Sequence, residues 1–325
     1  MTEHELMRIL TGGWVAEATF AAVRLGVADT IAGHRLSPGE IAEKVGAHPE
    51  ALGRLLRLLA GVGLADVDED GRYGLTPMGA LLGRDRLGPL VELYGEDYFG
   101  AAWRGLPHTL RTGETAFEHV FGEPVFAHLK GDPGKASVFN AGMAAGAAFF
   151  REVPVAHDFS GARTVVDLAG GTGALLGTVL RDHPEAGGIL FDVPGVVANA
   201  PAHLDRMGVL ERCELVGGDL FESVPEGGDV YLLSRILHDW DDDRCVRLLR
   251  NCARAMGKGA ELLVIERVVS ADTHLPLAFD LHMMVMTGGR ERTEEEYRAL
   301  LESAELLPGE LVDLPLGMRM LTATR

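Results

Sequence analysis

The stretch TVVDLAGGTGALLGTVLRDH, residues 164–183, decides the fold of this chain. It begins with an apolar run that predicts a buried strand, and it ends with apolar residues at helical spacing. Between them, Gly170, Gly171 and Gly173 predict a turn tight enough for the backbone to approach a ligand directly. A dinucleotide fingerprint would need a further glycine where Leu176 stands, and no lysine follows as in a phosphate-binding Walker loop. The stretch therefore predicts a strand, a nucleoside-binding loop and a helix.

The residues beyond this stretch continue to alternate between strand and helix patterns. Such alternation predicts an α/β fold, a mostly parallel sheet covered by helices on both faces, with ligands at the carboxyl ends of its strands. The predicted strands are 164–169, 187–192, 213–219, 229–237 and 260–266, and the predicted helices are 173–183, 194–208 and 242–256.

Two carboxylates follow the next two predicted strands. Asp192 lies 19 residues after Gly173, where an acid can accept hydrogen bonds from both ribose hydroxyls. Asp219 ends the third strand and is expected beside an adenine. Either acid alone could be a turn or capping residue. The loop and both acids at three successive strand ends predict a cofactor that contains a nucleoside but no pyrophosphate.

The first hundred residues predict a winged helix that does not bind DNA. Ser37 and Glu40 form a capping box, Leu52 to Leu59 an apolar helix stripe, and Asp70 with Gly71 a hairpin turn. Residues 35–79 hold five Lys or Arg against seven Asp or Glu, the opposite of what a DNA-reading helix needs. The apolar segment 7–31 instead favours a dimerisation module. We expect three regions, a winged-helix dimerisation domain (1–95), a helical connecting layer (96–157) and a catalytic domain (158–325).

Composition narrows the partners. The chain has 325 residues, 47% of them hydrophobic, and a formal net charge of -18, which opposes nucleic acid as a partner. No stretch approaches the roughly 18 apolar residues of a membrane span, and no targeting segment is apparent at either end. Three cysteines without paired spacing predict neither a disulfide framework nor a zinc site. We expect a cytoplasmic protein with no metal, no membrane partner and no nucleic-acid partner.

The motifs VVDLAGGTG, FDVPGVV, GGDLFESVP, LHDW and GGRERTEEEYRALLESAEL occur along the chain in one order. In that order they resemble the class I S-adenosylmethionine-dependent O-methyltransferases of the plant caffeate and flavonoid type, and their bacterial relatives in natural-product biosynthesis. The resemblance spans nearly the whole chain. It implies a winged-helix dimerisation domain, a helical middle and a seven-stranded Rossmann-like domain. It also implies a homodimer, S-adenosylmethionine as cofactor with S-adenosylhomocysteine as product, and methyl transfer to a hydroxyl of a small aromatic or polyketide-like molecule.

The resemblance assigns the cofactor-binding positions. This chain departs from the plant enzymes at Ala169, which is often glycine there, at Ser234, which is lysine, and at Arg235, which is tryptophan. Helical spacing ahead of the glycine loop adds Phe139 and Met143 as a wall facing the ligand. The implied positions are Ala169, Gly170, Gly171, Gly173, Asp192, Val193, Asp219, Leu220, Phe221, Ser234 and Arg235.

His238 follows the fourth predicted strand and matches the catalytic base of the family. A histidine with a pKa near 6.5 is a competent base for a phenol. The resemblance makes Glu266 the partner of the imidazole and Glu291 a second supporting carboxylate. Asp239 could contact the ligand as in the family, but we expect it rather to cap the helix that begins near Asp241.

The acceptor side is less determined. Asp280, Met283, Met284 and Trp103 are expected to line it, and His282, asparagine in many bacterial relatives, could bind the acceptor or serve structure alone. The acceptor group stays open among phenol, enol and carboxylic acid. Two alternatives also stay open. One is a family member that uses S-adenosylmethionine for hydroxylation, decarboxylation or cyclisation, and the other is a winged-helix regulator.

Overall fold

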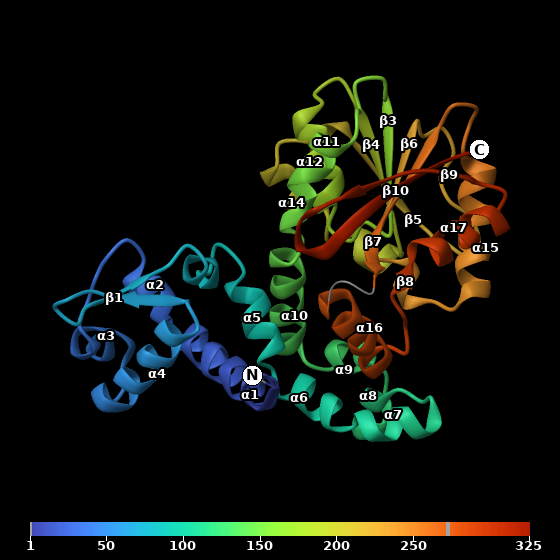
Figure 1. The fold of residues 1–325 in the computed structure, drawn as a ribbon. Coiled ribbons are helices and arrows are strands. Elements are labelled where there is room, and N and C mark those ends of the chain that lie inside the picture. The colour runs from blue at the N-terminus through green and yellow to red at the C-terminus, as the bar shows by residue number, and fades with distance from the viewer. Residues whose placement is uncertain (1, 271–273) are drawn as a thin grey trace. The chain divides into compact units, whose positions relative to one another are not determined.

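The computed structural model describes residues 2–270 and 274–325, which form two compact units (Figure 1). The first unit combines Met1–Ala101 with Phe126–Ala147, and the second combines Ala102–Val125 with Ala148–Arg325. The region 96–157, which the sequence groups as one connecting layer, contributes residues to both units.

The first unit has the predicted winged-helix elements. Ser37 caps α3 through its side chain, and Glu40 closes the capping box as predicted. Ala65 pairs with Leu75 in the antiparallel hairpin around Gly71. The elements of this part are α1 (Thr2–Arg24), α2 (Val27–Ile31), α3 (Pro38–Val45), α4 (Pro49–Gly61), β1 (Ala65–Val67), β2 (Tyr73–Leu75) and η1 (Gly79–Leu82).

Four further helices contribute to this unit. Helix α5 packs against α10 and α1. Two of the four, α6 and α9, run across the boundaries between the units. The helices are α5 (Gly88–Tyr94), α6 (Asp97–Arg104), α9 (Val125–Lys130) and α10 (Pro133–Ala145).

Helix α1 leaves an apolar surface uncovered. Ile9 and Trp14 are 76% and 72% exposed, although a large apolar side chain is stabilised by burial. Leu6, Met7 and Leu10 are exposed as well. This surface has the character of an interface for another chain.

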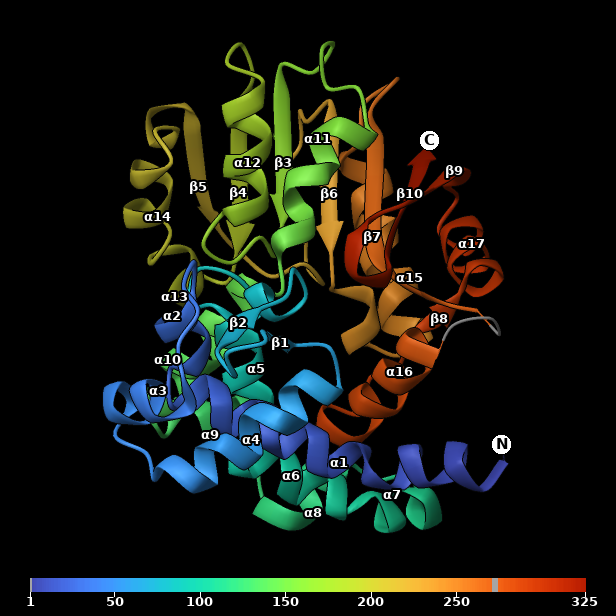
Figure 2. The same ribbon diagram turned by 60° about the vertical axis from the view of Figure 1, so that its left-hand side comes forward.

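The second unit is built on a sheet in the order β5-β4-β3-β6-β7-β10-β9, with β8 paired to β7 (Figure 2). The five strands β5, β4, β3, β6 and β7 run parallel to one another, and β10 is antiparallel to both of its neighbours. The strands are β3 (Thr164–Leu168), β4 (Gly187–Asp192), β5 (Cys213–Gly217), β6 (Val230–Ser234), β7 (Glu261–Val269), β8 (Arg292–Thr293), β9 (Leu307–Asp313) and β10 (Met318–Thr324).

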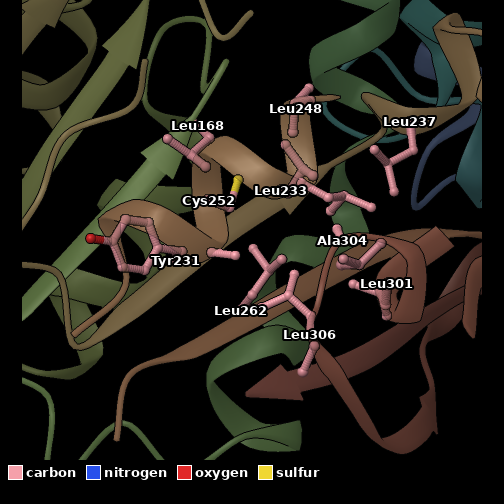
Figure 3. Close-up of a cluster of buried hydrophobic side chains, with 14 of the residues drawn as sticks. Leu168, Tyr231, Leu233, Leu237, Leu248, Cys252, Leu262, Leu301, Ala304 and Leu306 are labelled. Atoms are coloured by element: carbon pink, nitrogen blue, oxygen red, sulfur yellow. The ribbon is translucent and has the colours of Figure 1, made fainter. Parts of the chain in front are cut away.

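Helices cover both faces of this sheet, as the alternating pattern predicts (Figure 1). Leu233 and Leu262 from the sheet pack with Leu248 and Leu301 from the helices on one face (Figure 3). The helices of this unit are α7 (Leu106–Thr112), α8 (Ala116–Phe121), η2 (Ala148–Glu152), α11 (Val153–Ala156), α12 (Ala174–Asp182), α13 (Pro194–Val197), α14 (Pro201–Arg206), η3 (Leu210–Arg212), η4 (Leu237–Asp239), α15 (Asp242–Ala255), α16 (His274–Met286), α17 (Glu294–Ser303) and η5 (Pro315–Gly317).

Two predicted elements were wrong in extent. The strand expected over 229–237 ends at Ser234, because Arg235 takes a φ of 57° and turns the chain out of the sheet. The helix expected over 194–208 is two short helices, because Pro201 lacks the N–H that a continuous helix would use there. The first difference matters for function, since it places His238 on a one-turn 3-10 helix.

No helix in the described part of the chain combines the length and the apolar character needed to cross a membrane.

We predict that Gly79→Ala destabilises the first unit. A Cβ built on Gly79 would lie 1.7 Å from the carbonyl oxygen of Leu64, so the backbone must shift, and overpacking of this kind costs about 1–3 kcal/mol. Gly39→Ala is the control, because its Cβ would meet no described atom within 4 Å and alanine has the higher helix propensity. Urea unfolding followed by circular dichroism compares the two, and equal stabilities would contradict the close approach.

Candidate active site

The glycine loop between β3 and α12 has little room for side chains beneath it. A Cβ on Gly170 would lie 2.5 Å from the carboxyl of Asp167, and one on Gly173 would lie 2.8 Å from Leu204. Gly171 and Gly173 have φ of 61° and 78°, which disfavours other residues. Ala169 takes a φ of 52° with a Cβ present, so the loop tolerates alanine there at some cost in strain.

Above Gly171 the space is open, because an added Cβ would meet no described atom within 4 Å. Asp192, at the end of β4, ties this part of the loop to the neighbouring strand. Its Oδ2 accepts from Gly171 N at 2.9 Å and its Oδ1 accepts from Val193 N at 2.7 Å. The structure therefore brings the predicted glycine loop, Asp192 and Val193 together at one edge of the sheet.

Asp219 follows β5 at the same edge, and its Oδ1 accepts from Phe221 N at 2.8 Å. The bond is a turn contact, and Asp219 is exposed to solvent. The carbonyl of Leu220 accepts from Asn251 Nδ2, and the Phe221 ring meets Trp240 edge to face. The region expected to bind adenine is therefore braced by α15 and by the loop that carries His238.

Ser234 ends β6 and Arg235 follows it, four and three residues before His238 in the chain. Ser234 Oγ is buried and makes no hydrogen bond within residues 2–270 and 274–325, so a ligand hydroxyl or amine could satisfy it. The guanidinium of Arg235 lies over the rings of Phe149 and Phe150, at 5.7 and 5.6 Å from their centroids. These residues, with the open backbone at Gly171, fit a cofactor that carries a nucleoside.

His238 is the ionisable centre of the site. It is 8% exposed on η4, and its Nδ1 lies 3.1 Å from Glu291 Oε1 and 3.6 Å from Glu266 Oε2. Its Nε2 faces the other way, 3.9 Å from Asp239 Oδ1. An imidazole held through Nδ1 by a carboxylate presents Nε2 as a base.

The two glutamates divide the supporting roles differently from the expectation. Glu291 forms the hydrogen bond to the ring, whereas Glu266 Oε1 accepts from the backbone N–H of Ile236 and of Leu237, each at 2.8 Å. Glu266 therefore holds the turn before His238 and acts on the imidazole through its charge. The sequence could not separate these roles, because both residues are glutamates and their distances to the imidazole depend on how distant segments pack.

Electrostatics strengthen His238 as a base. Burial lowers the pKa of His238, but the charges of Glu266, Glu291 and Asp239 outweigh it and raise the pKa well above the usual 6.5. Burial also raises the pKa of Glu266, which the nearby imidazole partly offsets. A raised pKa makes the neutral imidazole a stronger base toward a phenol, whose pKa is about 10, and also means that the neutral form is populated only at higher pH.

The expectation that Asp239 caps the following helix was wrong. Asp241 occupies the N-cap position of α15, and its side chain accepts from Arg244 N at 2.8 Å. Asp239 lies on η4 beside His238, and burial raises its pKa. Asp239 is thereby left on the Nε2 side of the imidazole, where a ligand contact is possible.

The acceptor-side residues from α16 fall into different roles. Asp280 Oδ1 accepts from the backbone N–H of Glu291 at 3.0 Å, so it holds the segment that carries the carboxylate partner. Met283 is buried and Met284 partly buried, as expected for an apolar wall. The structure therefore gives Asp280 a role in holding the segment that carries Glu291.

His282 is paired with Trp103. Trp103 Nε1 donates to His282 Nδ1 at 3.2 Å, and the two rings stack. Burial, with the positive charges of Arg267 and His238 nearby, lowers the pKa of His282 to about 4. Because indole can only donate, His282 is neutral and carries its proton on Nε2.

His238, Glu266 and Glu291 also form a set of potential metal ligands, with their ligand atoms within 4.8 Å of one another. The hydrogen bond between His238 Nδ1 and Glu291 already gives these groups a role in orienting the base.

Phe139 and Met143 lie on α10 in the first unit, and their place in the site stays a prediction.

Two residues of the site, Asp167 and Arg292, were not predicted from the sequence. Asp167, buried under the glycine loop, accepts from Leu176 N at 3.2 Å, and burial raises its pKa to about 7. Its signal was visible as an acid inside an apolar strand. Arg292 is fully buried and bonds the backbone around His238. No local pattern distinguishes it from a surface arginine.

Comparison with known proteins agrees with this geometry. Residues 103–306 match an O-methyltransferase domain and residues 7–85 match an O-methyltransferase dimerisation domain. The chain is 42% identical to the 3-amino-4-hydroxybenzoate 4-O-methyltransferase of Streptomyces cremeus, over 98% of this chain and 89% of that protein.

Two solved structures are similar along nearly their whole length. The methyltransferase CalO1 of calicheamicin biosynthesis, with S-adenosylhomocysteine bound, superposes with a TM-score of 0.91 at 33% identity, covering 99% of this chain and 98% of that one. The O-methyltransferase NcsB1 of neocarzinostatin biosynthesis, with S-adenosylmethionine and 2-hydroxy-5-methyl naphthoic acid, gives 0.74 at 32%, covering 95% of each chain.

The matched dimerisation domain indicates a homodimer. The family follows from three observations, which are the nucleoside-binding loop, the histidine held by carboxylates and the whole-length similarities. The chain belongs to the S-adenosylmethionine-dependent O-methyltransferase family, in the branch that includes bacterial natural-product enzymes.

Proposed function

We propose that this enzyme methylates a phenolic hydroxyl of a small aromatic or polyketide-like intermediate, with His238 as the general base. The observation that carries the proposal is the buried hydrogen bond from His238 Nδ1 to Glu291, which leaves Nε2 to take a proton. The bound cofactor supplies an electrophilic methyl group on a sulfonium, so the protein's tasks are to place the acceptor oxygen and remove its proton.

The cofactor is proposed to bind along the carboxyl edge of the sheet. The backbone of the glycine loop from Ala169 to Gly173 approaches it, Asp192 accepts from its ribose, and Val193 lies beside that acid. Asp219, Leu220 and Phe221 are placed at its adenine. Ser234 and Arg235 complete the edge next to the base, and Phe139 and Met143 stay predicted cofactor residues. The open space at Gly171 and the buried, unsatisfied Oγ of Ser234 support this placement.

His238 acts as the methyl transfer proceeds. S-adenosylmethionine would supply the methyl group, its S–CH3 bond breaking as the O–C bond forms, and would leave as S-adenosylhomocysteine. The acceptor hydroxyl gives its proton to His238 Nε2 while Nδ1–H donates to Glu291. The new positive charge on the ring is stabilised by Glu266, Glu291 and Asp239, the same groups that raise its pKa. A carboxylic acid acceptor would arrive already ionised and would leave this base without a task, which favours a phenol.

The acceptor is proposed to lie between His238 and the wall formed by Met283, Met284 and Trp103, with His282 beside it. The relative from Streptomyces cremeus is named for a hydroxybenzoate, and NcsB1 was solved with a hydroxylated naphthoic acid. The hydroxybenzoate and the naphthoic acid are both flat phenolic acids. Apolar methionine side chains and an indole ring can pack against molecules of this class. We therefore propose hydroxybenzoate-like or hydroxynaphthoate-like acceptors as the first panel to screen with labelled S-adenosylmethionine.

We further propose that residues 1–95 form the dimerisation domain, 96–157 a connecting and substrate-lining region, and 158–325 the catalytic domain. The exposed apolar face of α1 supports the first assignment. A cytoplasmic location is proposed from the free thiols of Cys213, Cys245 and Cys252, which suit a reducing compartment. We expect no nucleic-acid or membrane partner.

His238→Ala is expected to lower kcat at least about 100-fold while the Kd for S-adenosylmethionine changes less than about twofold. The reason is that the imidazole acts on the acceptor proton and the cofactor lies along the neighbouring strand ends. Initial rates on a screened phenol, with calorimetric titration of the cofactor, test this. His203→Ala on α14 is the control, and a His238→Ala enzyme with full activity would remove the base assignment.

Glu291→Gln is expected to shift the rise of kcat/KM with pH toward lower pH. In the native chain the carboxylates raise the pKa of His238, so the free base appears only above the usual 6.5; an uncharged amide lowers that pKa. A pH–rate profile measures the midpoint, with Glu302→Gln on the surface of α17 as control. An unchanged midpoint would show that Glu291 does not act on the imidazole.

Asp192→Asn is expected to weaken S-adenosylmethionine binding about 10-fold to 100-fold. A hydrogen bond to a charged group contributes about 1.5–3 kcal/mol, and Asp192 also holds Gly171 in place. Asp205→Asn on the exposed side of α14 is the matched control. Equal cofactor affinities of the two variants would exclude Asp192 from the site.

A further inference from the structure

The charged side chain of Arg292 is fully buried, with no exposed surface. Its guanidinium makes four hydrogen bonds. Nη1 donates to Leu237 O at 2.9 Å, and Nη2 donates to Trp240 O at 2.7 Å. Nε and Nη2 both donate to Asp242 Oδ1, at 2.9 and 2.7 Å. A buried guanidinium is costly unless its donors find partners of this kind.

The two carbonyls bound by Arg292 stand immediately before and after the pair His238 and Asp239. The turn that carries this pair is a single turn of 3-10 helix, with internal backbone bonds of 3.2 Å from Asp239 N to Ile236 O and from Trp240 N to Leu237 O. Such short turns hold their shape weakly by themselves. The position of His238 therefore depends on groups outside the turn.

Those groups act on opposite sides of the turn. Glu266 accepts from its amides, and Arg292 donates to its carbonyls. The backbone N–H of Arg290 donates to the carbonyl of His238 itself at 2.9 Å. Arg290, Glu291 and Arg292 are consecutive, so one short segment fixes both the backbone of His238 and the orientation of its ring.

The fork geometry explains why arginine is needed. The guanidinium is planar and reaches two carbonyls and one carboxylate at fixed angles, whereas a lysine ammonium is a single point with three donors. Asp242, at the first turn of α15, neutralises the buried charge and orients the fork. Loss of the Arg292 guanidinium or of the Asp242 carboxylate would let the turn that carries His238 move relative to Glu291.

We propose that Arg292 is a positioning residue for the general base, holding His238 where Nε2 meets the acceptor hydroxyl. This inference rests on the proposed role of His238. A displacement of about 1 Å in such a group lowers turnover by up to about 100-fold without changing how the cofactor binds.

Arg292→Lys and Asp242→Asn test the proposal. Rates are measured with labelled S-adenosylmethionine and 3-amino-4-hydroxybenzoate, or the best phenol of the screened panel, and kcat is divided by the number of cofactor-binding sites found by titration. We expect Arg292→Lys to lower kcat per site about 10-fold to 100-fold, with the cofactor Kd within about twofold. Asp242→Asn should lower it about 3-fold to 10-fold, because the carbonyl bonds of the fork survive.

Arg298→Lys and Asp243→Asn are the matched controls, since both are surface residues of α17 and α15. A purely structural role would lower the melting temperature and the number of sites but leave kcat per site unchanged, and that result overturns the proposal. If Arg292→Lys does not fold, Asp242→Asn tests the proposal. Equal kcat per site in Asp242→Asn and Asp243→Asn would then overturn the proposal. Activity in His238→Ala would instead refute the base itself, so the two failures are distinguishable.

Discussion

The structure of the site depends on one buried interaction, the contact of the His238 imidazole with the carboxylates of Glu291 and Glu266. Two nearly fully buried acids beside one imidazole would be unfavourable without compensating donors. Glu266 is compensated by two backbone amides, and Glu291 by the imidazole. The residual negative charge has a function, because it raises the basicity of the ring that faces the acceptor.

The sheet explains how this pair comes to lie beside a cofactor site. Strands β3, β4, β5, β6 and β7 are parallel and adjacent, so their carboxyl ends share one edge. The glycine loop, Asp192 and the region of Asp219 end three of them, and Ser234 and Glu266 lie at or near the ends of the other two. Chemistry and cofactor recognition are therefore neighbours by topology, before any side chain is placed.

Local signals predicted much of this. The capping box of Ser37 and Glu40, the hairpin at Gly71 and the glycine loop depend on residues a few positions apart, and each formed as predicted. The end of β6 was missed because the apolar pattern continues to Leu237, although Arg235 turns the chain out of the sheet. The break at Pro201 was missed although the proline itself signals it. The role of Arg292 was also missed, because its partners lie about fifty positions away.

By itself, the sequence determined the α/β fold and the cofactor loop, because these follow from periodicity and glycine spacing within short windows. The resemblance carried by the ordered motifs identified His238 as the candidate base. Only the tertiary structure decided which glutamate bonds the imidazole and which holds the turn. It also decided that Asp241 rather than Asp239 caps α15, and that a buried arginine fixes the base. These outcomes depend on distances between segments far apart in the chain, which packing sets and local pattern does not encode.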